Sequence, residues 1–226
     1  MNRHITFRVL GAPVNAVQIP KVVQQMREWI GERQAGRYIT VTGMHGIMES
    51  RHDSNFRDIL ERADLVVPDG MPLVWLGRVH GHSLKRRVYG PELMESFCRE
   101  TGAQFRHFLY GGAAEVPSRL AEKLHRLYGT RVVGKYSPPF RPLTSSEEEQ
   151  VAALVRTAAP DVLWVGLSTP KQERWMAEHR DSLNVPVMIG VGAAFDFLVG
   201  RVAQAPPWMR EHGLEWFFRL VQEPRR

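Results

Sequence analysis

Residues 63–70 read Ala-Asp-Leu-Val-Val-Pro-Asp-Gly, and this short stretch indicates an open α/β fold. Residues 65–67 form an apolar run typical of a buried strand, and Pro68 ends it because proline lacks the N–H that a sheet ladder needs. Asp69 follows directly, at the place where ligands of open α/β sheets collect. On this stretch alone, a helix cap or a turn is the favoured role for Asp69, and a catalytic role is the alternative.

The same rhythm of strand, turn and helix continues along the chain. Apolar and β-branched runs predict strands at residues 5–10, 38–41, 65–67, 107–110, 131–133, 161–165 and 187–191. Helical spacing and end signals predict helices at residues 19–34, 54–62, 71–79, 90–101, 115–128 and 145–158, another that Pro170 opens, and an amphipathic one at 213–222. The pattern therefore predicts an α/β, Rossmann-like fold with a mostly parallel sheet flanked by helices.

Glycines follow at least four of the predicted strands, at Gly43, Gly111, Gly166 and Gly192. Glycine turns at strand ends let the backbone approach a ligand, so together they favour a phosphate-bearing ligand across the top of the sheet. No G-x-G-x-x-G fingerprint, P-loop or G-x-S-x-G elbow occurs. Lys171 and Gln172, at a predicted helix start, suit a phosphate or sugar hydroxyls.

Composition and net charge limit the classes of protein to which this chain can belong. The chain has 226 residues, a formal net charge of +6 and a single cysteine, Cys98, which excludes an intrachain disulfide. No signal peptide and no run of about eighteen apolar residues occurs, so we expect a cytoplasmic protein. The positive charge suits a nucleotide, a nucleic acid or an anionic membrane surface.

Seven stretches, in this order, resemble the WecG/TagA/CpsF family of bacterial glycosyltransferases (glycosyltransferase family 26). They are ADLVVPDG at 63–70, VYGPEL at 88–93, LYGG at 109–112, DVLWVGLSTPKQE at 161–173, GVGAAFDFLVG at 190–200, APPW at 205–208 and GLEWFFRLVQEPRR at 213–226. The resemblance covers nearly the whole chain, and the combination of the last patterns is specific.

The resemblance implies an inverting transfer of a sugar from a UDP-sugar to a polyprenyl-diphosphate-linked sugar. UDP-N-acetylmannosamine, its uronic acid or a hexose such as glucose are the implied donors, and bacterial surface polysaccharide or exopolysaccharide is the implied product. The protein would be peripherally associated with the inner face of the cytoplasmic membrane, would need no cofactor or metal, and would be compatible with a homo-oligomer. No nucleic-acid partner is expected.

The resemblance also assigns roles to residues. Asp69 matches the family's general base, and Thr42 matches its active-site threonine. Arg219 and Arg226 match C-terminal arginines that stabilise the leaving diphosphate. The expected substrate-binding residues are His45, Gly111, Gly112, Gly134, Tyr136, Gly166, Lys171, Gln172 and Asp196, with the glycine turns at 111–112 and 134 holding the nucleotide through backbone N–H groups.

Two features depart from the family pattern. The family often has Thr-x-Asn in the first loop, whereas here Thr42-Gly43 is followed by Met44-His45, so His45 would replace the hydrogen bonds of the asparagine. Relatives also often continue beyond the position of Arg226. We therefore expect a catalytic domain at 1–200 and a C-terminal helical appendage at 201–226 that is shorter than usual.

Three other functions compete with the transferase. A non-catalytic UDP-sugar-binding regulatory module would keep the glycine turns without needing a base. A nicotinamide oxidoreductase is disfavoured because the dinucleotide fingerprint is absent. Nucleic-acid binding rests on the positive charge alone, which equally suits an anionic leaflet.

Overall fold

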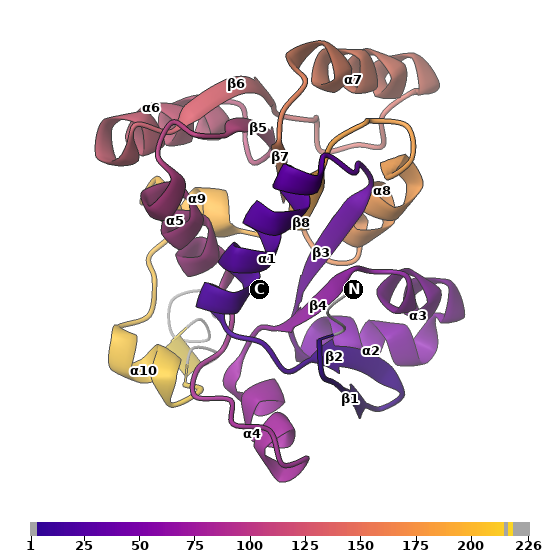
Figure 1. Cartoon of the computed structure of the whole chain (residues 1–226), viewed down its shortest axis with the longest axis vertical. Helices are drawn as coiled ribbons and strands as arrows, with labels where there is room; N and C mark the ends of the chain where they lie inside the picture. Colours follow the sequence, from indigo (N-terminus) through magenta and orange to yellow (C-terminus); the bar gives the residue numbers. More distant parts are fainter. Residues whose placement is uncertain (1–3, 215–216, 219–226) are drawn as a thin grey trace.

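A six-stranded parallel sheet forms the centre of the protein (Figure 1), and the predicted fold class is confirmed. The computed structural model describes residues 4–214 and 217–218. The strand order is β4-β3-β8-β7-β5-β6, and every neighbouring pair is parallel. The strands are β3 (Arg37–Thr42), β4 (Leu65–Pro68), β5 (Arg106–Gly111), β6 (Arg131–Tyr136), β7 (Val162–Gly166) and β8 (Val187–Gly190).

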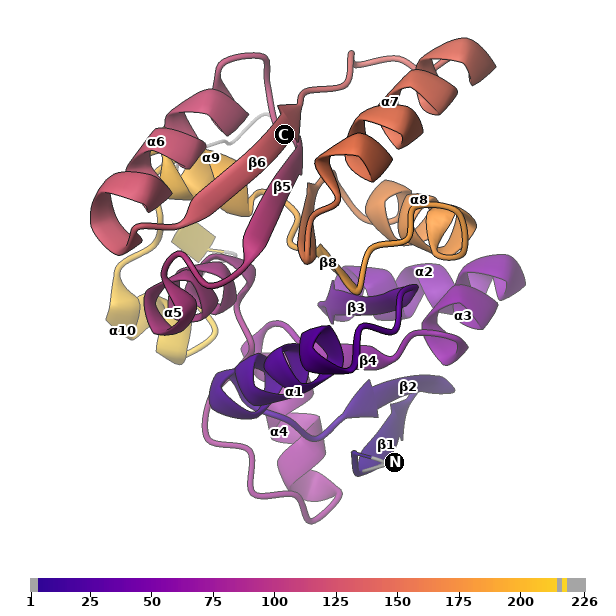
Figure 2. The ribbon, with the colours of Figure 1, turned by 45° about the horizontal axis from the view of Figure 1, so that its top comes forward.

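Helices cover both faces of this sheet because successive strand side chains point to opposite sides. In β3, Ile39 packs toward one layer of helices and Tyr38 toward the other, and both are fully buried. The first layer contains α1 (Ile19–Glu32), α5 (Gly90–Thr101), α6 (Val116–Tyr128) and α9 (Ala194–Leu198). The second contains α7 (Ser145–Ala158) and α8 (Lys171–His179), as Figure 2 shows.

A smaller cluster extends the second layer beside β4. It joins a hairpin of β1 (Thr6–Val9) and β2 (Ala12–Asn15) to α2 (Met44–His52), α3 (Ser54–Glu61) and α4 (Met71–Val79). The sequence analysis expected one strand that ends at residues 11–13, which is wrong. Leu10 and Gly11 take positive φ angles of 51° and 90°, and so turn the chain back into a second, antiparallel strand.

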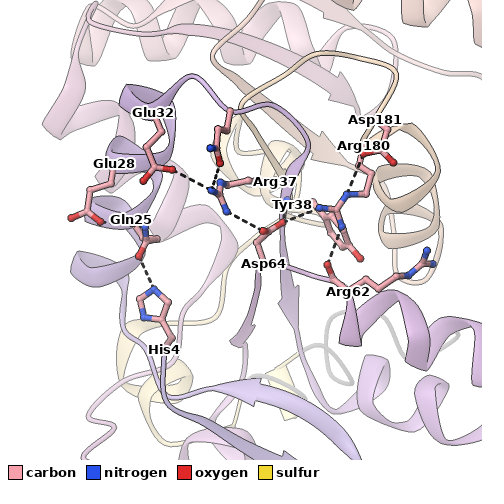
Figure 3. A network of polar contacts seen from close by, with 11 residues as sticks. His4, Gln25, Glu28, Glu32, Arg37, Tyr38, Arg62, Asp64, Arg180 and Asp181 are labelled. Carbon is pink, nitrogen blue, oxygen red and sulfur yellow. Dashed lines mark hydrogen bonds and ion pairs between the residues drawn. The ribbon is translucent and has the colours of Figure 1, made fainter. Parts of the chain in front are cut away.

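At the amino ends of β3 and β4, a polar network ties the two helical layers together (Figure 3). The Asp64 carboxylate accepts a hydrogen bond from the Tyr38 N–H at 3.0 Å and lies 3.3 Å from the Arg37 guanidinium. The Arg180 guanidinium, at the end of α8, lies 3.6 Å from the same carboxylate. This end of the sheet is therefore occupied by structural ion pairs, and the opposite, carboxyl end carries the candidate site.

Three local predictions need correction. Residues 44–46 are the first turn of α2 rather than a loop, because the apolar side chain of Ile47 draws this segment into the core. Strand β6 runs on through Gly134 to Tyr136, since its backbone pairs with β5 over that length. The spacing of Ser145 and Glu148 predicts a capping box at the start of α7, but the structure forms it one residue earlier, with Thr144 and Glu147.

Helix α10 (Pro207–Glu211), which the sequence analysis did not predict, follows α9. Most of the amphipathic helix expected at 213–222 lies outside the described residues. Over the part of the chain that is described, none of the helices is long and apolar enough to cross a bilayer.

Candidate active site

Asp69 and Thr42 leave neighbouring strands at the same edge of the sheet. Thr42 ends β3 and pairs with Pro68, the last residue of β4. The Asp69 N–H donates to the Thr42 carbonyl oxygen at 2.9 Å, and a Cβ on Gly43 would lie 3.3 Å from the Asp69 carbonyl oxygen. Main-chain contacts therefore fix the point from which the Asp69 carboxylate projects, whatever its side chain binds.

A cation faces that carboxylate. The Arg87 guanidinium lies 3.7 Å from Asp69 Oδ1, and only 13% of the Arg87 side chain is exposed. Arg87 also stacks 4.2 Å from the centroid of the Tyr89 ring, and Arg210 of α10 lies 5.6 Å from the same ring. A guanidinium this close favours the ionised form of the carboxylate and attracts phosphate oxygens.

Arg87 was not predicted as a site residue, because it stands in a run of basic residues at 85–87 that is typical of a solvated loop. The signal was the VYGPEL stretch that follows the arginine directly. Val88 donates its N–H to the Pro68 carbonyl oxygen at 2.7 Å, which pulls the basic loop against the end of β4. A pocket opens there between the loop, α4 and α10, and its lining is Met71, Lys85, Arg86, Arg87, Glu92, Arg210 and Glu211.

Gln172 braces two strand ends from within the protein. Its side chain is 1% exposed, its Oε1 accepts from the Gly192 N–H at 2.9 Å, and its Nε2 donates to Glu173 Oε1 at 3.0 Å. The Thr169 hydroxyl donates to the same Glu173 oxygen at 2.9 Å. Gln172 thus holds the turn after β8, and its predicted contact with a sugar or diphosphate stays a prediction.

Glu173 belongs to the same hydrogen-bonded group as Gln172, and it was not predicted as a site residue. It is 1% exposed, and among the described residues its Oε2 has no hydrogen-bond partner. Burial raises the pKa of the Glu173 carboxyl, while the hydrogen bonds from Gln172 and Thr169 and the nearby His45 act against that rise. Its signal in the sequence was the P-K-Q-E pattern at 170–173.

We expect Glu173→Gln to stabilise the protein increasingly as the pH rises. A raised pKa means that the folded state holds this proton more tightly than the unfolded chain, so ionisation costs folding free energy above the ordinary pKa of 4.5. Glutamine keeps the accepting oxygen and cannot ionise. From about pH 4 to about pH 7, the free energy of unfolding of the variant should rise relative to that of the wild type. Glu178→Gln, exposed on the same helix, is the control, and a constant difference across the range would contradict the prediction.

The glycines at the ends of β5 and β7 pack against each other. A Cβ on Gly111 would lie 2.4 Å from the Gly166 carbonyl oxygen, and one on Gly166 would lie 2.8 Å from the Phe195 ring. The Gly112 N–H donates to the Gly166 carbonyl oxygen at 3.2 Å, and the Gly112 carbonyl oxygen accepts from Ser137 Oγ at 2.5 Å. In this structure the Gly112 N–H is therefore used within the protein, and its contact with a nucleotide stays a prediction.

Gly134 also has a structural position. It pairs with Phe108 inside the sheet, and its Cβ would lie 2.4 Å from the Phe108 ring. Gly134 therefore lies in a strand rather than in a turn, and its missing side chain leaves room for an aromatic ring. Its contact with a nucleotide stays a prediction. Tyr136 ends the same strand, and its ring stacks on Tyr110 at a centroid distance of 6.1 Å.

The remaining expected residues lie around the same rim. His45 is exposed on the first turn of α2, close enough to Glu173 to influence its charge. Lys171 is exposed at the start of α8. Asp196 lies in α9 rather than in a turn, and its carboxylate is 3.3 Å from the Arg201 guanidinium. Gly46 of α2 lies close to both Thr42 and Thr169, because a Cβ on Gly46 would lie 3.0 Å from Thr42 Cγ2 and 3.6 Å from Thr169 Cγ2.

Arg219 and Arg226 lie outside the described residues. Within residues 4–214 and 217–218, no group of three or more His, Cys, Asp or Glu side chains is arranged to hold a metal ion. Among the described residues, the Arg87 guanidinium is 3.7 Å from the Asp69 carboxylate, and the Arg210 guanidinium lies by the same Tyr89 ring as Arg87.

The sequence is similar to those of known glycosyl transferases. A family model described as "Glycosyl transferase WecG/TagA/CpsF family" matches residues 7–226. Among curated proteins, the chain is 27% identical over 196 residues to the N-acetylglucosaminyldiphosphoundecaprenol N-acetyl-beta-D-mannosaminyltransferase of Bacillus subtilis (strain 168). It is 26% identical over 196 residues to the protein of the same name from Bacillus spizizenii. Each alignment covers 86% of this chain and 75% of the relative.

Proposed function

The chain belongs to the WecG/TagA/CpsF family of glycosyl transferases, and from this we propose that it moves N-acetylmannosamine from a UDP-linked donor to an N-acetylglucosaminyl-diphospho-polyprenol acceptor. The names of the two Bacillus relatives support the sugar and the acceptor. The observation that carries the proposal is the pairing of Asp69 with Arg87 at the carboxyl end of β4. It puts a base and a cation side by side, and transfer from a sugar diphosphate needs both.

In the proposed reaction, an acceptor hydroxyl oxygen attacks the anomeric carbon of the donor sugar from the side opposite UDP. A new carbon–oxygen bond forms, the bond between the anomeric carbon and the UDP oxygen breaks, and UDP leaves with the electron pair. The Asp69 carboxylate takes the hydroxyl proton, since an ionised carboxylate can orient and deprotonate an O–H group. The configuration at the anomeric carbon is inverted.

In the proposed mechanism, cations stabilise the negative charge that develops on the departing UDP. Arg87 and Arg210 supply guanidinium groups around the Tyr89 ring, and forked guanidinium donors match phosphate oxygens well. By the family resemblance, Arg219 and Arg226 would add to them. The reaction would take place at the cytoplasmic face of the membrane, where the polyprenyl acceptor is anchored.

A donor screen tests this function. UDP-N-acetylmannosamine should raise the melting temperature more than UDP alone, because a ligand that binds only the folded state stabilises it. It should also support transfer to N-acetylglucosaminyl-diphospho-undecaprenol, followed as a mass increase of the lipid. A larger shift and faster transfer with UDP-glucose would instead assign a hexose, in line with the altered Met44-His45 segment at the start of α2. Donor binding without transfer to any acceptor would favour a non-catalytic binding module.

A further inference from the structure

Helix α4 is apolar on its outer face as well as on its inner face. Leu73 and Val74 are fully buried against the hairpin, whereas Trp75 is 46% exposed and Val79 is 82% exposed. Pro72, one turn before Trp75, is exposed too. Exposed apolar side chains one turn apart on a surface helix form an apolar patch, and such patches mark surfaces that contact protein or lipid.

Helix α10 and the residues after it widen this surface. Trp208 of α10 is 58% exposed and Leu214 is 36% exposed. Gly213 lies against Trp75, since its Cβ would be 3.0 Å from Trp75 Cη2. Figures 1 and 2 both show α4 and α10 at the end of the molecule away from α7. We call Pro72, Trp75, Val79 and Trp208 the α4 face.

Cationic side chains border the α4 face. Arg78 lies on α4 itself, and Lys85 and Arg86 lie on the following loop, all exposed. Arg86 pairs with Glu211 at 3.1 Å, which joins the loop to α10. Exposed tryptophans next to lysine and arginine are typical of surfaces that enter the interface of an anionic bilayer.

From these observations we infer that the α4 face docks on the surface of an anionic lipid bilayer. The inference rests on the proposed function, because a polyprenyl acceptor has to be reached from a membrane. Helix α4 begins two residues after Asp69, and its first residue, Met71, lines the pocket to which Arg87 also contributes. Docking here would bring the head of a lipid-linked acceptor to Asp69.

Charge argues for a bilayer over a second copy of this chain. In a two-fold dimer the same surface patch meets itself, so Arg78, Lys85 and Arg86 would approach their own copies. Like charges oppose that association, whereas the phosphates of an anionic leaflet pair with all three. A membrane therefore satisfies both the apolar centre and the cationic border.

The test is sedimentation of the full chain with vesicles, without donor or acceptor. Binding to phosphatidylglycerol–phosphatidylcholine vesicles should exceed binding to phosphatidylcholine alone. Trp75→Ser/Val79→Ser should weaken binding to the anionic vesicles about ten-fold, because the removed side chains carry apolar area into the interface. The control, Leu127→Ser/Leu154→Ser, changes two leucines that are each 50% exposed on α6 and α7, and should leave binding unchanged.

Val79→Asp provides a second variant with little risk to folding, because Val79 is 82% exposed, and it should also release the protein from anionic vesicles. Unchanged vesicle affinity in both variants would overturn the inference. So would a wild-type dimer that these variants convert to monomer without a change in vesicle affinity. Failure of the proposed function would look different, because the wild type would then bind vesicles and transfer no sugar even to a short, water-soluble acceptor.

Discussion

The Asp69→Asn variant is expected to keep its fold and its affinity for UDP and to lose turnover by about 10²–10⁴-fold, the usual contribution of a general base. Asparagine has nearly the same shape, and the Asp69 N–H that donates to Thr42 belongs to the main chain, so the strand ends should stay in place. What disappears is the charge that accepts the acceptor's proton and faces Arg87 at 3.7 Å. Steady-state transfer with saturating donor measures the loss, and a thermal shift with UDP checks the binding.

Asp181→Asn is the matched control. Asp181 is also an aspartate close to an arginine, 3.8 Å from Arg180, but 94% of its side chain is exposed at the opposite end of the sheet. It should leave turnover unchanged. Full turnover by Asp69→Asn with a true lipid-linked acceptor would remove Asp69 from the role of base.

Gly111→Ala is expected to destabilise the fold by about 3 kcal/mol or more, with a melting temperature lower by about 6–12 °C for a chain of this size. Gly111 has a φ of 130°, which side chains other than glycine rarely adopt. Its Cβ would also lie 2.4 Å from the Gly166 carbonyl oxygen, inside a parallel strand pair that cannot widen without losing hydrogen bonds. Both effects act in the same direction.

Two further glycines separate these effects. Gly129 has a φ of 69° and open space around its Cβ position, so alanine there should cost only the left-handed strain, about 1–2 kcal/mol. Gly31 lies in α1 with neither a positive φ nor a close neighbour, so alanine should stabilise the protein by about 0.5–1 kcal/mol. In thermal denaturation, the melting temperature should be highest for Gly31→Ala, lower for Gly129→Ala and lowest for Gly111→Ala. Equal losses at Gly129 and Gly111 would show that the close approach to Gly166 does not matter.

Local signals in the sequence were strong enough to predict the sheet. Each of its six strands contains a short apolar or β-branched run followed by glycine, proline or a polar residue, although β6 continues beyond its run through Gly134. The hairpin and the first turn of α2 were missed for a different reason. Residues 12–15 and 44–47 carry weak local preferences, and their conformation is set by packing of Val14 and Ile47 into the cluster beside β4.

Position along the chain predicted only part of the candidate site. It put Asp69 and Thr42 directly after strands, whereas their catalytic roles came from the family resemblance and stay predictions. Gly134 was predicted in a turn because the local sequence around a glycine does not distinguish a turn from a strand interior. The Phe108 ring, which requires the missing side chain, is distant in sequence. Arg87 and Glu173 were overlooked because their roles depend on partners from other segments, which spacing along the chain does not reveal.

The strand order has a consequence for how the chain folds. β8 is the last strand in sequence, yet it lies in the middle of the sheet between β3 and β7. A polypeptide emerging from the ribosome can pair β3 with β4, and β5 with β6 and β7, but the two halves stay apart until residues 187–190 are made. Until then β3 and β7 each present an unpaired edge rich in valine and isoleucine or leucine, the kind of surface that chaperones shield from aggregation.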